Sequence, residues 1–158
     1  MLRVALLLGV MGMTGVLDIA GANPPPDDLA GLQGNWKPLQ CEYQGVPQMP
    51  ADVMKQVTVV FDKSEYYLYF VDKGHDGQPK VLRLALANVS LDQGTSPKSI
   101  VFEFAEGPFK GQKRHGIYEL AGNQLKMCYG PTDKPKPTEF KAPAGSGYFL
   151  ETWARQTK

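Results

Sequence analysis

Short runs in which every second residue is apolar, separated by turn residues, constrain the fold of this chain more than any other feature. The segment RHGIYELAGNQLKMCYG shows the pattern best, because Gly122-Asn123 supplies two residues that tolerate the positive φ of a tight hairpin turn. Pairing outward from that turn sets Leu120 against Leu125 on one face and Glu119 against Lys126 on the other. We therefore expect a hairpin with one apolar face and one solvated face.

The same alternation recurs along the rest of the chain. A turn at Lys63-Ser64 sets Phe61 against Tyr66, so that the apolar sets of the two flanking strands share a side. The residues expected to face inward are Val57, Val59, Phe61, Tyr66, Leu68, Phe70, Leu82, Leu84, Leu86, Phe102, Phe104, Tyr118, Leu120, Leu125 and Met127. One helical turn is expected near 50–56. Eight such strands predict an all-β barrel or sandwich, and the hairpin spacing favours an eight-stranded antiparallel up-and-down barrel.

The first expected strand opens with Gly34, Asn35 and Trp36, and a side chain as large as Trp needs a cover at that point. Closure of a barrel brings the last strand beside the first, and antiparallel pairing then places Arg155 near Trp36. A guanidinium over an indole is a favourable cation–π arrangement that contributes about 0.5–2 kcal/mol. We therefore expect Gly34, Trp36 and Arg155 to form the structural closure of one barrel end.

A Gly-x-Trp at the start and an Arg near the end resemble the lipocalin/fatty-acid-binding superfamily, in which the Arg packs on the Trp. The segments LQGNWK, FEFAEGPFKGQKRHGIYELAGNQLKMCYGP and KPTEFKAPAGSG are more closely similar to a Planctomycetes-type uncharacterised lipocalin-like domain family. Members of that family are small, often exported bacterial proteins with the order LxGxW, GIYEL, LKxC and PTEF. The resemblance implies a lipocalin-like barrel and no particular activity, because the family is one of unknown function.

The first 22 residues have the pattern of a signal peptide. Arg3 precedes an apolar run that is short and glycine-rich for a membrane span, and Ala20-Gly21-Ala22 is a small-x-small cleavage pattern. We expect a signal peptide at 1–22, a Pro-rich linker at 23–29 and one domain at 30–158, exported to the periplasm, the cell envelope or the medium. The formal net charge of +1 gives no field for nucleic acid, or for a membrane surface after cleavage.

Patterns that would indicate catalysis or metal binding are weak. His115 and Cys128 are expected on one outer face at diagonal spacing, without a pocket or an orienting acid, and His75 falls in a turn-rich loop. Neither HxH nor CxxC spacing occurs, so we expect no metal, no cofactor and no enzymatic activity. Cys41 and Cys128 form a candidate disulfide, although both are expected to face outward with the last strand between them, unless a bulge at Pro38 shifts the parity of the first strand.

The function is therefore expected to lie in the barrel interior. The candidate ligand-binding residues are Phe61, Tyr66, Leu68, Phe70, Leu84, Phe102, Phe104, Tyr118 and Met127. Their side chains either fill the interior completely or leave room for one small ligand. The leading hypothesis is an exported lipocalin-like protein that binds a small hydrophobic ligand. The alternative is an interaction protein, such as a barrel-type inhibitor of an exported protease that presents its N-terminal linker or the 130–147 loop.

Overall fold

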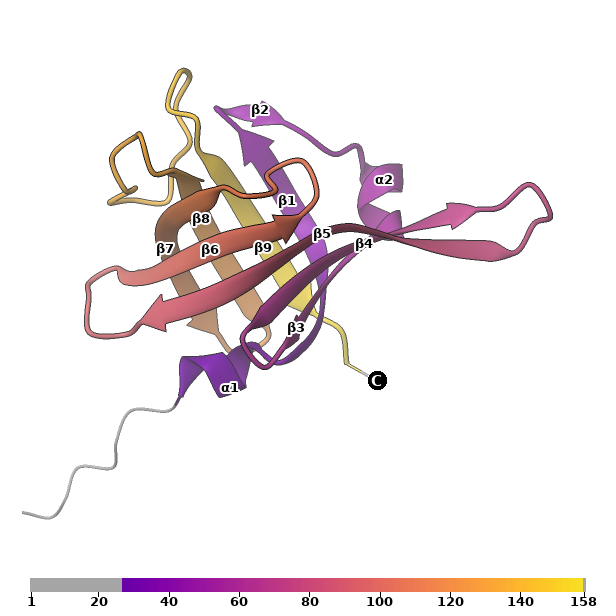
Figure 1. Ribbon diagram of the computed structural model, residues 1–158, viewed down its shortest axis with the longest axis horizontal. Helices are drawn as coiled ribbons and strands as arrows, with labels where there is room; N and C mark the ends of the chain where they lie inside the picture. The colour runs from indigo at the N-terminus through magenta and orange to yellow at the C-terminus, as the bar shows by residue number, and fades with distance from the viewer. Residues whose placement is uncertain (1–26, 158) are drawn as a thin grey trace, which may run out of the picture.

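The structure, a computed structural model, describes residues 27–157. The expected signal peptide at 1–22 and most of the expected linker at 23–29 lie outside the described residues. Within them, the chain forms two short helices and nine strands (Figure 1). In chain order these are α1 (Asp28–Leu32), β1 (Gly34–Tyr43), β2 (Val46–Pro47), α2 (Ala51–Gln56), β3 (Val57–Asp62), β4 (Glu65–Lys73), β5 (Pro79–Asp92), β6 (Lys98–Glu106), β7 (Lys113–Ala121), β8 (Gln124–Pro131) and β9 (Phe149–Arg155).

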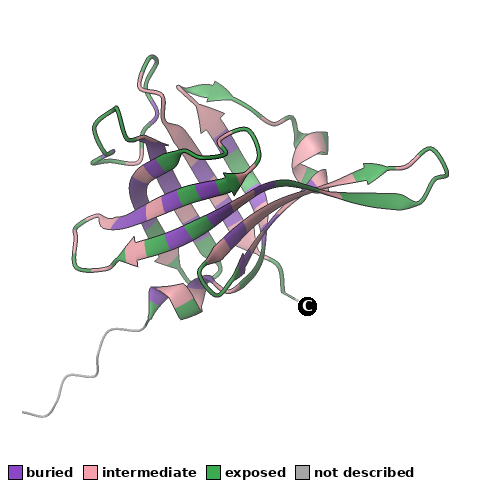
Figure 2. Ribbon diagram, viewed as in Figure 1, coloured by how far each residue is buried: buried purple, intermediate pink, exposed green. Residues whose placement is uncertain are grey.

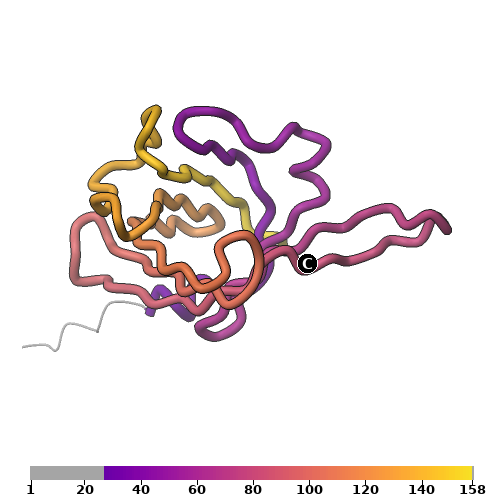
Figure 3. The backbone as a smooth tube through the Cα atoms, turned by 45° about the horizontal axis from the view of Figure 1, so that its top comes forward, coloured from indigo at the N-terminus to yellow at the C-terminus, as the bar shows by residue number. Residues whose placement is uncertain are grey.

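The strands form one closed antiparallel barrel, which confirms the predicted fold class. Neighbours in the sheet follow the chain order from β3 to β9, and β1 pairs with both β3 and β9 to close the ring (Figure 3). The two-residue β2 only extends the edge of β1, so eight strands make up the barrel wall. The expected helical turn is α2, whereas α1 was not expected from the sequence and begins inside the segment predicted as linker.

Two predicted hairpin registers are confirmed. Phe61 lies opposite Tyr66 across the β3–β4 turn, and Leu120 lies opposite Leu125 across the β7–β8 turn. Buried and more exposed residues alternate along much of the barrel wall (Figure 2), as expected when successive side chains point in turn into the barrel and out of it.

The prediction of which β5 side chains face the barrel interior is wrong from the middle of the strand onward. Leu84 is the extra residue of a β-bulge, because Leu68 pairs with Ala85 while the next residue, Tyr69, pairs with Arg83. A bulge of one residue exchanges the two faces of the strand that follows it. Small side chains therefore face the interior where the sequence pattern suggested Leu84 and Leu86; they are Ala85, Ala87 and Val89.

The outer halves of β4 and β5 leave the barrel as a two-stranded arm, defined here as residues 71–84, which projects to one side in Figure 1. The pairing of β3 with β4 stops at Phe70, and the pairing of β6 with β5 starts only at Leu86. Within residues 27–157 the arm therefore has no neighbouring strand on either side, and most of its residues are exposed (Figure 2).

Trp36 closes one end of the barrel. Its side chain is fully buried, its indole Nε1 donates to the Leu32 carbonyl at 2.8 Å, and the Arg155 guanidinium carbon lies 4.2 Å from the ring centroid. Arg155 also donates to the carbonyl oxygens of Gln33 and Gly31, so one side chain joins β9 to the segment that precedes β1. The backbone at Gly34 has φ +108°, a conformation that other residues adopt only with strain.

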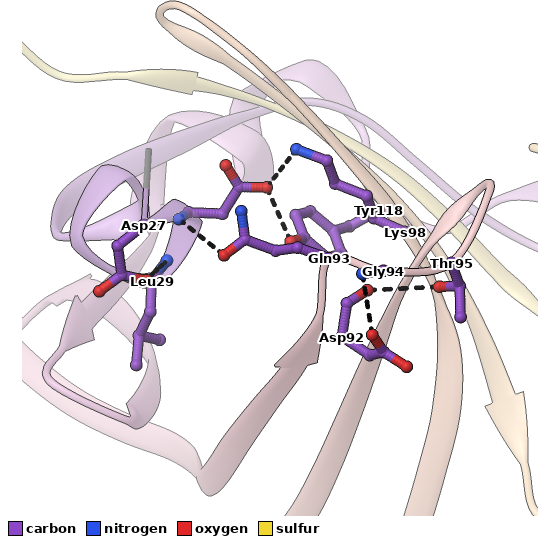
Figure 4. Close-up of polar contacts among 9 residues, drawn as sticks. Asp27, Leu29, Asp92, Gln93, Gly94, Thr95, Lys98 and Tyr118 are labelled. Carbon is purple, nitrogen blue, oxygen red and sulfur yellow. Dashed lines mark hydrogen bonds and ion pairs between the residues drawn. The ribbon is translucent and has the colours of Figure 1, made fainter. Parts of the chain in front are cut away.

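Helix α1 caps the same end through a buried carboxylate. Asp28 accepts a hydrogen bond from Tyr118 at 2.8 Å and pairs with Lys98 at 2.6 Å, while its backbone N–H donates to Gln93 (Figure 4). The neighbouring Asp27 accepts from the Leu29 backbone N–H and so caps the helix N-terminus. These bonds hold a five-residue helix across the barrel end, although a helix of that length is not stable alone.

Replacement of Arg155 by Ala should lower the free energy of unfolding by about 1–3 kcal/mol, because the cation–π contact and two hydrogen bonds are lost. Urea denaturation followed by tryptophan fluorescence measures the change. The matched control is Arg83→Ala, which removes an exposed ion pair with Glu106 and should cost less than about 1 kcal/mol. Equal losses in the two variants would show that Arg155 does not stabilise the closed end.

Candidate functional site

A cavity of about 360 Å³ opens at the barrel end opposite α1 and Trp36. Its walls come from the barrel interior near this open end, from the segment before α2 and from the β6–β7 loop. Most of the side chains in these walls are aromatic or aliphatic. They comprise Cys41, Gln48, Met49, Tyr66, Leu68, Leu84, Ala85, Phe104, Pro108, Phe109, Tyr129, Phe149, Glu151 and Trp153. This volume lies at the lower end of the range for small-molecule sites.

The structure divides the nine residues predicted to bind a ligand into two groups. Tyr66, Leu68, Leu84 and Phe104 line the cavity, although Leu84 is 40% exposed and reaches only its rim. The other five do not line it: Phe61, Phe102, Tyr118 and Met127 are packed in the core, and Phe70 packs against the core from a partly buried position. The interior is therefore filled near the closed end and hollow near the open end.

Small side chains are what leave this space open. Ala85 stands in the wall where the sequence pattern suggested a leucine, because of the bulge at Leu84.

On β7, Gly116 lies directly opposite Tyr129, and a Cβ atom at Gly116 would come within 2.2 Å of the Cys128 carbonyl oxygen. Tyr129 can therefore pack against β7 only because residue 116 has no side chain.

A second bulge turns Cys41 into the cavity. Pro38 pairs with Trp153 and Gln40 with Thr152, so Leu39 is the extra residue, and its side chain is 53% exposed. The expectation that Cys41 faces outward is therefore wrong: the bulge exchanges the faces of β1, and Cys41 lies opposite Glu151 on the inner side.

The two cysteines of the candidate disulfide are both free and buried. Cys41 contacts Glu151 inside the barrel, whereas Cys128 donates from the other face of the wall to the Lys141 carbonyl at 3.3 Å. Strand β9 lies between the strands that carry them. A bridge between them is not formed in the structure, and its geometry would require the barrel wall to open.

The polar group of the cavity is Glu151, whose side chain is buried. One carboxylate oxygen accepts from the Tyr129 hydroxyl at 2.9 Å and from the Cys41 thiol at 3.8 Å, and the other accepts from the Trp153 indole at 3.0 Å. Burial raises the pKa of Glu151 above its ordinary value, while these hydrogen bonds act in the opposite direction. No ion pair involves Glu151 within residues 27–157.

Sequence reasoning missed several of these wall residues. Glu151 lies between Phe149 and Trp153 at period two, so extending the alternation of β9 back from Arg155 would have placed all three inside. In the same way, Tyr129 follows Met127 by two residues on β8. No local pattern marks Phe109, since it belongs to the β6–β7 loop and reaches the cavity only through the fold.

The outer face of the barrel is occupied by the long segment between β8 and β9. His115 bonds to the Lys134 carbonyl at 2.9 Å, Cys128 bonds to the Lys141 carbonyl, and Tyr148 donates to the Pro135 carbonyl at 2.7 Å. His115 and Cys128 therefore hold this segment in place and do not bond to each other. Among the described residues, His, Cys, Asp and Glu form no group of three or more that could bind a metal ion.

Replacement of Glu151 by Gln should change how stability depends on pH. The folded-state pKa of Glu151 lies above the unfolded value of about 4.5, so the wild-type carboxyl stabilises the fold most at low pH, and that contribution is lost as pH rises through the folded-state pKa. Relative to wild type, Glu151→Gln should therefore gain stability as pH rises above about 4.5, by at most about 1.4 kcal/mol per pH unit.

Urea denaturation of both proteins at a series of pH values from acid to neutral measures this difference. Glu103→Gln, at an exposed ion pair with Lys113, is the control for removing one negative charge from the protein. A stability difference between wild type and Glu151→Gln that does not vary with pH would contradict the assignment.

Both thiols should be unreactive in the folded protein. Burial raises the pKa of Cys128 to about 11 and that of Cys41 further, so neither forms much thiolate at neutral pH. Titration with a thiol reagent should detect two cysteines in denaturant without prior reduction and almost none in the native state. Two thiols that appear only after reduction would show a disulfide.

In the part of the chain that the structure describes, no helix has the length and apolar character needed to span a membrane. A comparison of the sequence with models of known protein families finds no match, and neither does a search of curated proteins.

Proposed function

We propose that this protein is an exported carrier that binds one small hydrophobic ligand in the cavity at the open end of its barrel. The observation that supports this proposal is the cavity itself: about 360 Å³ walled by aromatic and aliphatic side chains with one buried carboxyl. Export is supported only by the signal-peptide pattern of the first 22 residues.

Apolar walls around an open cavity favour an apolar occupant. Ordered water is stable in a cavity when it finds two to four polar partners, and most of this lining offers none. A ligand that covers Tyr66, Phe104 and Phe149 removes apolar surface from water, which is favourable by roughly 25 cal/mol per Å². The aromatic side chains also favour a flat or ring-containing ligand, because rings stack or meet edge to face.

Glu151 is better suited to order the walls than to hold a ligand. Its carboxylate already accepts hydrogen bonds from Tyr129, Trp153 and Cys41, three of the cavity-lining residues. The bonds fix the orientation of the phenol and the indole, and the cavity is thereby formed before a ligand arrives. A preformed site loses less conformational entropy on binding.

The observed contacts give less support to the alternative of a protease inhibitor. Such a protein would present a free loop, whereas the 130–147 segment is held to the barrel by bonds from His115, Cys128 and Tyr148. The other candidate for presentation, the linker at 23–29, lies almost entirely outside the described residues. The carrier function therefore has the more direct structural support.

A larger side chain at Ala85 should weaken ligand binding. We expect naphthylethanol, a neutral probe with a flat apolar body, to bind wild type and raise its melting temperature, because it binds the native state alone. Ala85→Met should reduce its affinity at least about tenfold by filling the cavity. Calorimetric titration and thermal denaturation measure the two effects.

Ala121→Met is the matched control, because Ala121 is exposed at the closed end of the barrel and should leave the affinity unchanged. If wild type bound neither naphthylethanol nor any other apolar probe of similar size, the carrier function would be wrong.

A further inference from the structure

Arg114 is a buried cation whose hydrogen-bonding capacity is largely unused. Its side chain faces inward near the start of β7, two residues before Gly116, and the residue is only 7% exposed. The atoms Nε and Nη1 are buried and have no hydrogen-bond partner in residues 27–157, while Nη2 has one long bond of 3.4 Å to Gln112. None of the ion pairs among these residues includes Arg114.

The guanidinium lies against two aromatic rings of the cavity wall. Its central carbon is 3.7 Å from the centroid of the Phe109 ring and 5.7 Å from that of Phe149, and both rings line the cavity. Phe109 stacks on the guanidinium and packs edge to face on Phe104 and Phe149. Arg114 itself does not line the cavity, and the partly buried Phe109 ring is in contact with both the guanidinium and the cavity.

The unsatisfied donors distinguish Arg114 from Glu151. A buried carboxyl can avoid its desolvation cost by taking up a proton, and Glu151 already accepts three hydrogen bonds. Arg stays protonated in proteins, so Arg114 keeps its charge and its unpaired N–H groups. Cation–π contacts with two rings offset only part of this cost. A partner that satisfies the guanidinium must therefore be an anion or a strong acceptor.

We propose that Arg114 binds the carboxylate of an amphipathic ligand whose apolar body occupies the cavity. A guanidinium can hold a carboxylate with two parallel hydrogen bonds along either of two edges. One edge presents Nη2 and Nε, and the other presents Nη2 and Nη1. Nε and Nη1 are unpaired, and Nη2 is released when its long bond to Gln112 breaks. Rotation of the Phe109 side chain away from the guanidinium opens the contact. The inference rests on the proposed carrier function and specifies the class of ligand.

Charge around Arg114 favours a ligand with a single negative charge. Asp133 is the carboxylate whose charge interacts with the guanidinium, and it is exposed on the segment after β8. The carboxylate of Asp133 opposes a second negative charge nearby, and no other cation is stacked on the cavity rings in the described part of the chain. A monocarboxylate therefore fits better than a doubly charged phosphate.

Calorimetric titration of the full chain with naphthylacetate, naphthylethanol and naphthylethylamine tests the inference, because the three probes share an aromatic body and differ in head group. Wild type should bind naphthylacetate at least about tenfold more tightly than naphthylethanol, and naphthylethylamine more weakly than either. Arg114→Met should lose the preference for the acid while its affinity for the alcohol stays within about threefold. Arg83→Met, which changes an exposed arginine, should retain the preference.

Each other outcome has a distinct meaning. If wild type bound the alcohol and the acid equally, or preferred the amine, the role of Arg114 would be wrong and the carrier function would stand. If none of the three bound, the carrier function and this inference would both fail. An acid preference that survived in Arg114→Met would overturn the assignment to Arg114.

A folding defect in Arg114→Met would not leave the question open. We expect this variant to melt at or above the wild-type temperature, because an apolar side chain of similar length replaces buried unpaired donors. If it did not fold, Arg114→Lys supplies the second test, because it keeps the charge but removes the two-bond geometry. The ratio of the affinity for naphthylacetate to that for naphthylethanol should then fall to about half of the wild-type ratio or less. A full preference in Arg114→Lys would contradict paired hydrogen bonding.

Discussion

The pairing of β1 with β9 is the constraint on which the rest of the structure depends. It turns a sheet of consecutive hairpins into a closed wall, so that no full-length edge strand remains and the interior is shielded from water. Trp36 and Arg155 lie at one end of this pairing, and the bulge at Leu39 lies within it. The β1–β9 pairing thus fills the closed end of the barrel with Trp36 and turns Cys41 toward the cavity at the open end.

The sequence predicts the barrel well because the information is local. Turn residues and period-two alternation determine the β3–β4 and β7–β8 registers, and the hairpin spacing favours the barrel over a sandwich. Bulges are not encoded in the alternation itself. Leu84 and Leu39 each add one residue to a strand, and each time the predicted inner and outer faces are exchanged beyond that point. The inward positions of Ala85 and Cys41 could therefore not be derived from the pattern.

The candidate site was only partly predictable for the same reason. Tyr66, Leu68 and Phe104 come before any extra residue in their own strands exchanges the two faces, so the alternation places them correctly in the cavity wall. Glu151 was equally accessible to that reasoning, but a charged residue in a terminal strand is ordinarily assigned to solvent. Phe109 and Arg114 are in contact because the β6–β7 loop folds back over the start of β7, and the alternation within the strands does not describe the path of a loop.

The two buried charges represent two different solutions to the cost of desolvation. Glu151 is surrounded by donors from its own barrel, whereas Arg114 has aromatic faces and one long hydrogen bond. A protein that served only its own stability would pair such groups with each other or replace them by apolar side chains. Among residues 27–157 neither group takes part in an ion pair, so no opposite charge offsets the cost of burying them.

The arm formed by residues 71–84 has a consequence for how copies of this protein behave in concentrated solution. Beyond the barrel, β4 and β5 pair with each other but with no third strand, so each carries a row of unpaired backbone groups that could recruit a strand from another molecule. The side chains there include Asp72, Lys73, Asp76 and Lys80. Charge along both edges raises the cost of adding a neighbour's strand, so the arm opposes edge-to-edge pairing with other copies of the chain.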